Sequence, residues 1–479
     1  MVDPPLVTAT DVGLFEPSAR PWDEARAAGP AGTGLIEALE GAEDLDGLRA
    51  DVRSYLDAAG VRFGDGSGWP FTVDPVPRVL SADEWRTLAA GLEQRVRALD
   101  AFVRDAYGPR LAVDAGIITD GQIEQTEGYE PLLRGVWPEP AMALGVSGLD
   151  IVRDDDGTLL VLEDNLRTPS GLAYAVAARR AVVGALTARG IATPPIRDMP
   201  GESIALLGAA LRAAAPHGTK EPQSVVLTDG PSSVAYYEHA WLAAQLGVPL
   251  VTLADLERSR FGRLRRRDAD GRPHDIDVVY RRTDSDLLHG PDGALTPVAA
   301  ALLEPWLDGR LGIVNGFGTG VGDDKLTHAR VENLIRMYLG QEPLLRSVPT
   351  LELGDRDALA QVLDDPRAYV IKDRHGEGGK GVTVCRDAEE ADLSALLEDV
   401  RAEPHEYVAQ LVVPLSTHPT VVDDGVLEPR HVDLRPFVFF TADGPRAAPG
   451  GLTRVALKRG SLVVNSSQQG GAKDTWVLS

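Results

Sequence analysis

Residues 148–171, with the sequence GLDIVRDDDGTLLVLEDNLRTPSG, decide the fold of this chain. Two short apolar runs flank an Asp-Gly turn, and this arrangement predicts a β-hairpin. Side chains alternate between the two faces of a strand, so Glu163 and Asn165 leave the second strand on the same side. The hairpin folds Asp150, on the first strand, back towards them.

Asp150, Glu163 and Asn165 would place three oxygen donors on adjacent strands. Mg²⁺ takes one or two carboxylates together with phosphate oxygens and water, so the three residues are a candidate magnesium site. The alternative is an exposed acidic hairpin in which Glu163 and Asn165 only cap the turn that follows. The hairpin alone leaves both interpretations open, and the rest of the chain has to decide between them.

The composition describes an acidic globular protein. The 479 residues include 72 Asp and Glu against 48 Lys and Arg, a net charge of −24. That length allows two or three domains, and that charge argues against general nucleic-acid binding and against an anionic membrane surface. No stretch approaches the ~18 to 20 apolar residues of a membrane-spanning helix, and no signal-peptide pattern is present, so a cytoplasmic location is expected.

The single cysteine, Cys385, excludes an intrachain disulfide framework and a multi-cysteine zinc site. It follows an apolar, strand-like run and is predicted to be a packed core thiol. Elsewhere, residues 81–107 predict a long amphipathic helix with Ser81 as its N-cap. Another helix is predicted over residues 171–189, after a polar strand end.

A block of alternating strands and helices follows, at residues 200–320. Strands predicted at 224–228, 249–253 and 276–280, with a helix at 232–246, indicate a parallel sheet in a small Rossmann-like domain. The block lacks a GxGxxG fingerprint and is therefore not expected to bind a dinucleotide.

Arg281 and Arg282 follow the third of these strands, at the end where α/β sheets usually bind ligands. They are candidate substrate-binding residues. The alternative, a solvated loop whose arginines pair with nearby acids, is equally compatible with the sequence.

A glycine-rich loop at residues 374–381 joins two predicted strands. Glycines let the backbone N–H groups of such a hairpin approach phosphates closely. Lys372, at the end of the first strand, would add an ammonium group beside them. A plain flexible turn is the alternative.

The C-terminal part contains several predicted strands. The apolar run at residues 407–413 could flank a flat ring such as adenine. Arg435 and Arg454 lie in strand-like contexts, where an arginine is either part of a buried ion pair or a clamp for an anion.

Taken together, these motifs resemble the ATP-grasp superfamily. In those enzymes the Asp and the Glu-x-Asn come after the glycine-rich loop, whereas here they precede it by about 200 residues. That order, with the motifs VLEDNLRTPSG, AYYEHAWLA, YRR, GTGVGDDK, RHVDLRPF and GGLTRV, resembles the circularly permuted ATP-grasp group related to glutathionylspermidine synthetase. The resemblance runs from about residue 65 to the C-terminus. It implies an α/β (α+β) fold, a circularly permuted ATP-grasp fold with a small Rossmann-like parallel-sheet domain.

The resemblance also implies a division of the chain into four parts. These are a partly irregular N-terminal segment (1–70), the permuted part of the catalytic domain with the metal-binding hairpin (71–199), the Rossmann-like substrate domain (200–320), and the nucleotide-binding lid with the remaining catalytic sheet (321–479).

ATP and Mg²⁺ are the cofactors that the resemblance implies. It assigns Mg²⁺ to Asp150, Glu163 and Asn165. It assigns ATP to Lys325, Lys372, Gly376, Gly378, Gly379 and Gly381, and the adenine hinge to Gln410, Leu411, Val412 and Val413. It places Arg435, Arg454 and Arg167 near phosphate or acyl-phosphate charge.

The activity implied is that of an ATP-dependent carboxylate–amine (or thiol) ligase. Its partners would be a small-molecule or peptide carboxylate and an amine acceptor, with the loop 374–381 as the candidate lid. A homodimer or a separate partner protein is compatible with this reading. The rival hypotheses are a phosphotransferase of the same fold and a non-catalytic, ATP-binding regulatory protein.

Overall fold

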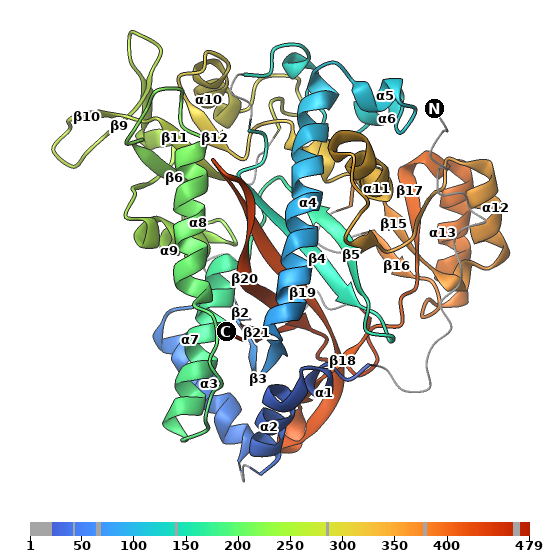
Figure 1. Cartoon of the computed structure of the whole chain (residues 1–479). Coiled ribbons are helices and arrows are strands. Elements are labelled where there is room, and N and C mark those ends of the chain that lie inside the picture. The colour runs from blue at the N-terminus through green and yellow to red at the C-terminus, as the bar shows by residue number, and fades with distance from the viewer. Residues whose placement is uncertain are drawn as a thin grey trace.

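Strands from both ends of the chain form one large mixed sheet (Figure 1). The computed structural model describes residues 22–41, 44–63, 69–138, 142–283, 287–376, 381–462 and 470–479. In these residues the strand order is β13-β5-β4-β19-β20-β21-β3, and β18 pairs with β19. The strands are β3 (Val73–Leu80), β4 (Val146–Arg153), β5 (Leu159–Asn165), β13 (Arg346–Ser347), β18 (Thr417–Val421), β19 (Leu427–Thr441), β20 (Gly444–Val455) and β21 (Gly471–Val477).

The predicted hairpin is formed by β4 and β5. Its turn contains Gly157 at a φ of 93°, a backbone conformation that favours glycine. In the antiparallel register Asp150 lies directly opposite Glu163, whereas Ile151 pairs with Val161. This shift leaves a β-bulge next to Asp150, and bulges re-aim side chains on the bulged strand.

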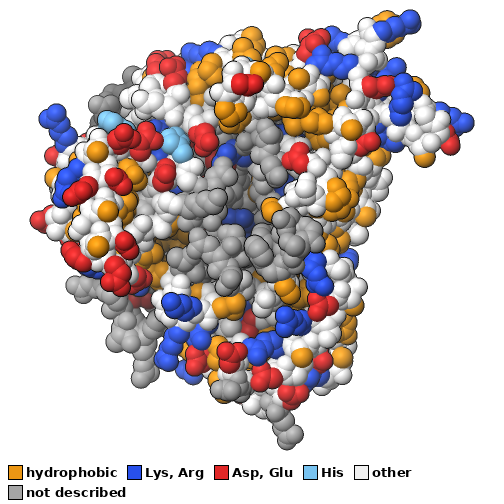
Figure 2. All heavy atoms as spheres, turned by 180° about the vertical axis from the view of Figure 1, so that it is seen from behind, with side chains coloured by type: hydrophobic (Ala, Val, Ile, Leu, Met, Phe, Trp, Pro, Cys, Tyr) orange, Lys and Arg blue, Asp and Glu red, His pale blue; other side chains and the backbone are white. Residues whose placement is uncertain are grey.

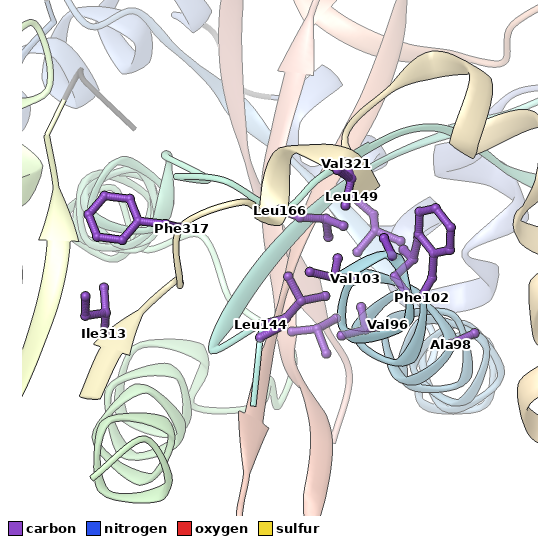
Figure 3. Packing of buried hydrophobic residues seen from close by; sticks show 14 of the residues in the cluster. Val96, Ala98, Phe102, Val103, Leu144, Leu149, Leu166, Ile313, Phe317 and Val321 are labelled. Atoms are coloured by element: carbon purple, nitrogen blue, oxygen red, sulfur yellow. The ribbon is translucent and has the colours of Figure 1, made fainter. Parts of the chain in front are cut away.

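Helix α4 (Ala82–Tyr107) covers one face of the large sheet. Its N-cap is Ser81, as predicted, with Ser81 Oγ accepting a hydrogen bond from the backbone N–H of Glu84 at 3.2 Å. Figure 3 shows Val96 and Phe102 of this helix packed near Leu149 and Leu166 of the hairpin region, in a cluster of buried apolar residues. That cluster holds the hairpin in place from behind.

A second, parallel sheet has the strand order β12-β11-β6-β7. Its strands are β6 (Ser224–Thr228), β7 (Leu250–Val251), β11 (Val278–Arg282) and β12 (Gly312–Val314), accompanied by helices α8 (Met199–Ala213), α9 (Tyr236–Leu246) and α10 (Pro297–Leu307). The expected parallel strands are therefore present.

Two expected bounds in this sheet were wrong. The strand expected at 249–253 is shorter, because Thr252 forms a capping box with Asp255 and starts a 3-10 helix. The strand expected at 276–280 begins two residues later, since the backbone N–H of Ile276 donates to the carbonyl oxygen of Leu264 and not to a strand of the parallel sheet. As a result Arg281 and Arg282 lie inside the strand rather than after it, and both are buried.

The third main sheet is antiparallel, in the order β14-β17-β15-β16. It comprises β14 (Thr350–Glu352), β15 (Tyr369–Asp373), β16 (Val382–Val384) and β17 (Tyr407–Leu411), with helices α12 (Arg356–Asp364) and α13 (Glu390–Ala402). Cys385 is fully buried in the core of this unit, which confirms the predicted core thiol. The glycine-rich loop joins β15 to β16 as the predicted hairpin.

The remaining elements surround these sheets. They are α1 (Glu24–Ala27), α2 (Gly29–Glu40), α3 (Leu45–Ala58), β1 (Arg62–Phe63), β2 (Trp69–Pro70), α5 (Leu111–Asp114), α6 (Asp120–Glu124), α7 (Leu172–Ala188), α11 (Lys325–Leu339), and the three-stranded sheet β8 (Leu256–Arg258), β9 (Leu264–Arg267) and β10 (Pro273–Asp275). This last sheet projects from the body and carries several arginines (Figures 1 and 2). In the parts of the chain that are described, no helix is both long and apolar enough to span a membrane.

Candidate active site

A cavity of ≈ 500 Å³ lies where the large sheet faces the antiparallel sheet of β14–β17. Its lining comes from β4, β5, the loop after β5, the start of α11, β15 to β17, β19 and β20. Most of the residues assigned to ATP and Mg²⁺ from the sequence are part of that lining. They are Asp150, Glu163, Asn165, Arg167, Lys325, Lys372, Gly376, Gln410, Leu411, Val413, Arg435 and Arg454.

Glu163 and Lys372 join the two sheets across this cavity. Lys372 Nζ lies 3.1 Å from Glu163 Oε1, and the lysine side chain is 5% exposed. Burial raises the pKa of the Glu163 carboxyl, but Lys372 and Lys325 together outweigh burial and hold that pKa below its usual value. Glu163 is therefore ionised at neutral pH, as a ligand for a cation must be.

Asp150 sits beside a pair of arginines. Arg435 binds both carboxylate oxygens, at 2.7 and 2.9 Å, and Arg454 binds Oδ2 at 2.7 Å while it also pairs with Asp433. Burial raises the pKa of Asp150, but the two guanidinium groups outweigh burial and lower it to about 2. Both arginines form ion pairs, which was one of the two alternatives for them, and both line the cavity, so the anion clamp stays a prediction.

This cluster gives stability a defined pH dependence. An Asp carboxyl in an unfolded chain has a pKa of about 3.9, against about 2 for Asp150 in the folded protein. Between these two pKa values the native state binds fewer protons than the unfolded state. The ionised Asp150 side chain therefore contributes fully to the free energy of unfolding above about pH 4, and this contribution disappears as the pH falls towards 2. We expect the difference in unfolding free energy between the wild type and Asp150→Asn, measured in urea, to shrink over this window. A difference that stays constant from about pH 5 to about pH 2.5 would contradict the lowered pKa of Asp150.

The donor set fits Mg²⁺. Asp150 accepts three guanidinium hydrogen bonds and so retains one carboxylate lone pair, and Lys372 binds Glu163 through Oε1. Asn165 Nδ2 is buried and has no hydrogen-bond partner among the described residues, which leaves the amide able to turn its oxygen towards a cation. No three His, Cys, Asp or Glu side chains converge for a metal within the described ranges. Two carboxylates and an amide are what Mg²⁺ uses when phosphate oxygens and water complete its shell.

The base of the glycine-rich loop is tied to the start of α11. Lys325 Nζ donates to the carbonyl oxygen of Gly376 at 2.6 Å, and Arg374 pairs with Asp324, the N-cap of α11, at 2.8 Å. Burial, together with the neighbouring Lys372, lowers the pKa of Lys325, although Glu163 opposes the shift. The loop closes on Gly381, whose φ is 67°. Gly378 and Gly379, also assigned to ATP, lie outside the described residues.

Part of the cavity lining is apolar and comes from β4, β5 and the antiparallel sheet; this part is called the apolar slot. It is lined by Val152, Leu162, Val370, Val384, Leu411, Val413, Leu415 and Leu462. Gln410 Nε2 donates to the carbonyl oxygen of Leu162 and to Thr350 Oγ1, both at 3.1 Å. Val412 is not part of the lining, and its backbone N–H donates to Ala368 at 2.9 Å. Three of the four expected hinge residues thus reach the cavity.

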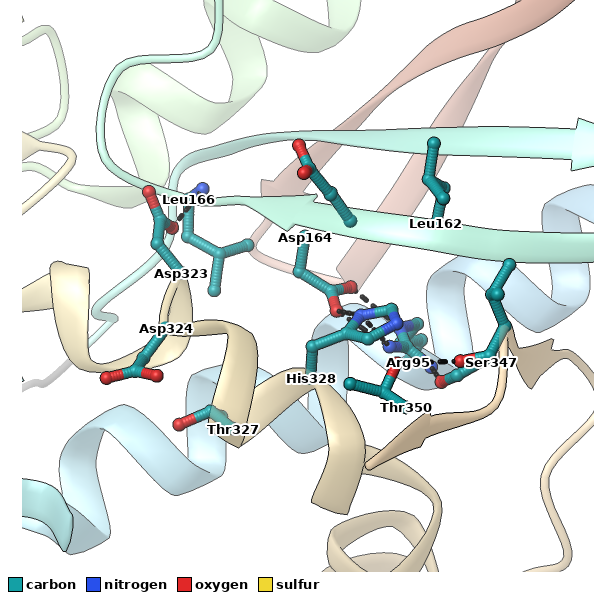
Figure 4. A network of polar contacts seen from close by, with 12 residues as sticks. Arg95, Leu162, Asp164, Leu166, Asp323, Asp324, Thr327, His328, Ser347 and Thr350 are labelled. Carbon is teal, nitrogen blue, oxygen red and sulfur yellow. Dashed lines mark hydrogen bonds and ion pairs between the residues drawn. The ribbon is translucent and has the colours of Figure 1, made fainter. Parts of the chain in front are cut away.

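Asp164 lies between Glu163 and Asn165 on β5, so its side chain leaves the strand on the opposite face. Figure 4 shows it pointing towards Arg95 and His328. Arg95 of α4 binds both of its oxygens at 2.6 Å, and His328 Nδ1 lies 2.8 Å from Oδ2. Burial raises the pKa of Asp164, but Arg95 and His328 together outweigh burial and hold that pKa well below the usual range. Arg95 also donates to Ser347 Oγ at 3.0 Å, so one buried network connects β5, α4, α11 and β13 directly behind the candidate metal ligands.

The sequence did not assign a role to Arg95, Asp164 or His328. One signal was available: Arg95 lies within the apolar stripe of α4, between Leu92 and Leu99. A charged residue on the buried face of a helix needs a partner of opposite charge.

The two candidate substrate arginines of β11 do not line the cavity. Arg281 packs over the ring of Phe317, with 4.8 Å between the guanidinium carbon and the ring centroid. Arg282 contacts the loop after β5 and Glu238. Arg167, by contrast, does line the cavity and pairs with Asp323 at 3.1 Å.

The chain matches the family described as circularly permuted ATP-grasp type 2 over residues 77–456. It belongs to that family. The family assignment agrees with the order of the site along the chain, where the hairpin with Glu163 precedes the strand with Lys372, and it confirms both the resemblance and the fold class expected from the sequence.

Curated relatives of this circularly permuted ATP-grasp protein come from several bacteria. A protein of Frankia casuarinae (strain DSM 45818 / CECT 9043 / HFP020203 / CcI3), named "Putative glutamate--cysteine ligase 2-2", is 45% identical over 86% of this chain and 48% of its own length. An uncharacterized protein of Synechocystis sp. (strain ATCC 27184 / PCC 6803 / Kazusa) is 41% identical over 85% of this chain and 84% of its own length. The chain spans about half the length of the first curated relatives it matches.

Among solved structures, a glutathione synthetase-like effector from Globodera pallida, in its apo form, has a TM-score of 0.55. The match covers 91% of this chain and 97% of the other, at 14% sequence identity. At that identity the likeness supports the fold.

Proposed function

We propose that this ATP-grasp protein is an ATP-dependent carboxylate–amine (or thiol) ligase that forms an acyl phosphate. The main support is the Glu163–Lys372 contact, which places an ionised carboxylate and an ammonium at 3.1 Å where two sheets meet over one cavity. An apolar slot on one side and an arginine pair on the other fit a nucleotide and a reacting carboxylate.

In this proposal the nucleotide lies with its base in the slot beside Gln410, and its phosphates near Lys325 and Lys372. Both lysines line the cavity, and they come from different elements, α11 and β15. Asp150, Glu163 and Asn165 would hold Mg²⁺, which neutralises phosphate charge when bound. Phosphoryl transfer needs alignment and charge stabilisation rather than a protein nucleophile, and these side chains supply both.

The chemistry balances without any further reagent. A carboxylate oxygen of the substrate attacks the γ-phosphorus of ATP, the bond to the β-phosphate oxygen breaks, and ADP leaves. An amine (or thiol) then attacks the acyl carbon, so phosphate leaves with the former carboxylate oxygen and a proton is released. Arg435 and Arg454 lie beside Asp150, where they can balance charge on the carboxylate and on the departing phosphate.

An acyl phosphate has to be shielded from water. The loop 374–381 is the proposed lid; Lys325 contacts its base at Gly376, and Arg374, the first residue of the loop, pairs with Asp324. The four-part domain division given above, a cytoplasmic location, and a homodimer or a separate partner protein belong to this proposal as well.

The substrates proposed for a first test follow the relatives' names. L-Glutamate is the first carboxylate and L-cysteine the first acceptor, within a wider panel of amino acids and short peptides. Glutamate supplies a carboxylate that can be activated beside Arg435, and cysteine supplies an amine that can displace the phosphate.

Hydroxylamine trapping tests the proposal. The protein is incubated with Mg²⁺-ATP, one carboxylate at a time, and hydroxylamine, and both ADP and hydroxamate are measured. We expect equal amounts of ADP and hydroxamate with one carboxylate of the panel. ADP with a stable phosphorylated product and no hydroxamate would support the phosphotransferase alternative. ATP binding without ADP formation for any carboxylate would support a non-catalytic protein.

A further inference from the structure

We infer that Glu238 and Arg282 are positioning residues that fix the loop 167–171 at the acceptor end of the cavity. The inference rests on the proposed ligase function, because it assigns this loop to the bound carboxylate and amine. Neither side chain lines the cavity, whereas all five residues of the loop do. The two residues therefore act through the loop.

Glu238, in α9 beside the parallel sheet, caps the N-terminus of α7. Its side chain, near the start of α9, is 1% exposed, and Oε2 accepts hydrogen bonds from the backbone N–H groups of Gly171 at 2.9 Å and Ala173 at 3.0 Å. These N–H groups belong to the first turn of α7, where Gly171 is an N-cap with no side chain of its own. The first N–H groups of a helix lack partners inside the helix and attract negative charge, so Glu238 determines where α7 begins.

Arg282 extends this contact to the loop itself. Its Nη2 lies 2.8 Å from Glu238 Oε1, its Nη1 donates to the carbonyl oxygen of Pro169 at 2.8 Å, and it also binds Ser170 Oγ. The donors of a guanidinium have a fixed planar geometry, so contacts to three groups set the positions of these groups relative to one another. The parallel sheet thus holds the loop through β11 and α9.

Gly171 sets the course of the loop. Its φ of 126° is a conformation that side chains rarely adopt. A Cβ at this position would lie 3.2 Å from Leu452 Cδ2 and 3.3 Å from Phe437 Cζ. The chain therefore turns sharply against β20 and β19, and the contacts of Glu238 and Arg282 lie on either side of that turn.

The course of β5 identifies the loop as the acceptor end. Leu162 contacts Gln410 at the nucleotide end, Glu163 contacts Lys372 in the middle, and residues 167–171 follow beyond Asn165. In a ligase of this kind the reacting carboxylate lies beyond the terminal phosphate, on the side away from the base. Lining residues near the loop combine apolar surface with positive charge; they are Phe71, Tyr174, Leu452 and Arg435.

The test compares Glu238→Gln and Arg282→Lys with the wild type. Arg258→Lys is the matched control, because Arg258 forms an exposed ion pair with Glu304 near the same sheet. Amide hydrogen exchange is measured for peptides of the whole chain, Mg²⁺-ATP affinity by calorimetry, and KM for ATP and for the carboxylate in the hydroxamate assay. We expect exchange in peptides over 166–175 to accelerate at least about tenfold in both variants. The Kd of Mg²⁺-ATP should stay within about twofold while KM for the carboxylate rises about tenfold or more.

Unchanged exchange over 166–175 would overturn the inference, as would faster exchange spread evenly over the parallel sheet. A raised KM for ATP with an unchanged KM for the carboxylate would overturn the assignment of the acceptor end. If the wild type forms no hydroxamate with any carboxylate, the proposed function fails, and the exchange data still decide whether the pair positions the loop.

Discussion

Glu163→Gln is expected to lower ATP turnover by about 10³-fold or more. Glutamine keeps the size of the side chain but removes the charge that Mg²⁺ needs, and it leaves the buried Lys372 without its carboxylate partner. The measurements are ADP formation with the carboxylate identified by trapping, and calorimetric binding of ATP with and without Mg²⁺. The dependence of ATP affinity on Mg²⁺ should weaken together with turnover.

Asp156→Asn is the matched control for this variant. Asp156 lies in the turn of the same hairpin, is exposed, and is not part of the cavity lining. It should retain turnover within about twofold, because exposed substitutions away from a site have small effects. Wild-type turnover in Glu163→Gln would contradict the assignment of Glu163 to the metal.

The second large effect concerns stability. Asp164→Asn should lower the free energy of unfolding by about 3–5 kcal/mol, since it leaves the guanidinium of Arg95 buried without a charged partner. Both side chains are at most 1% exposed. Urea unfolding at pH 7 measures the change.

Two controls separate this charge effect from a general loss of packing. The double variant Arg95→Met/Asp164→Leu removes both charges and should recover much of the lost stability, as replacement of buried ion pairs by apolar residues often does. Asp83→Asn breaks an exposed pair with Arg86 at the start of α4 and should change the unfolding free energy by less than about 0.5 kcal/mol. A loss below about 1 kcal/mol in Asp164→Asn would show that Arg95 finds other partners.

The sequence predicted the parts of the fold that have local causes. The Asp-Gly turn defined the hairpin, and with it the register that sets Asp150 opposite Glu163. Ser81 defined the start of α4. The permuted order of the hairpin and the glycine-rich loop was enough to indicate the family.

Contacts between distant segments could not be predicted in the same way. Arg95 and Asp164 are 69 positions apart, and only the fold brings them together. Glu238 stands in the motif AYYEHAWLA, but its partners include backbone N–H groups that leave no trace in the sequence. Arg282 was expected at the end of a strand, and the shift of β11 by two residues buries it beside Glu238 instead.

Isotope transfer from the carboxylate to phosphate tests the central claim most directly. The carboxylate identified by trapping is labelled with ¹⁸O in both oxygens and incubated with the protein, Mg²⁺-ATP and an amine, and the released phosphate is analysed by mass spectrometry. An acyl phosphate predicts one ¹⁸O atom in each phosphate released, because the bridging oxygen comes from the substrate. Unlabelled phosphate, with both labelled oxygens still in the carboxylate, would contradict the proposed ligase mechanism.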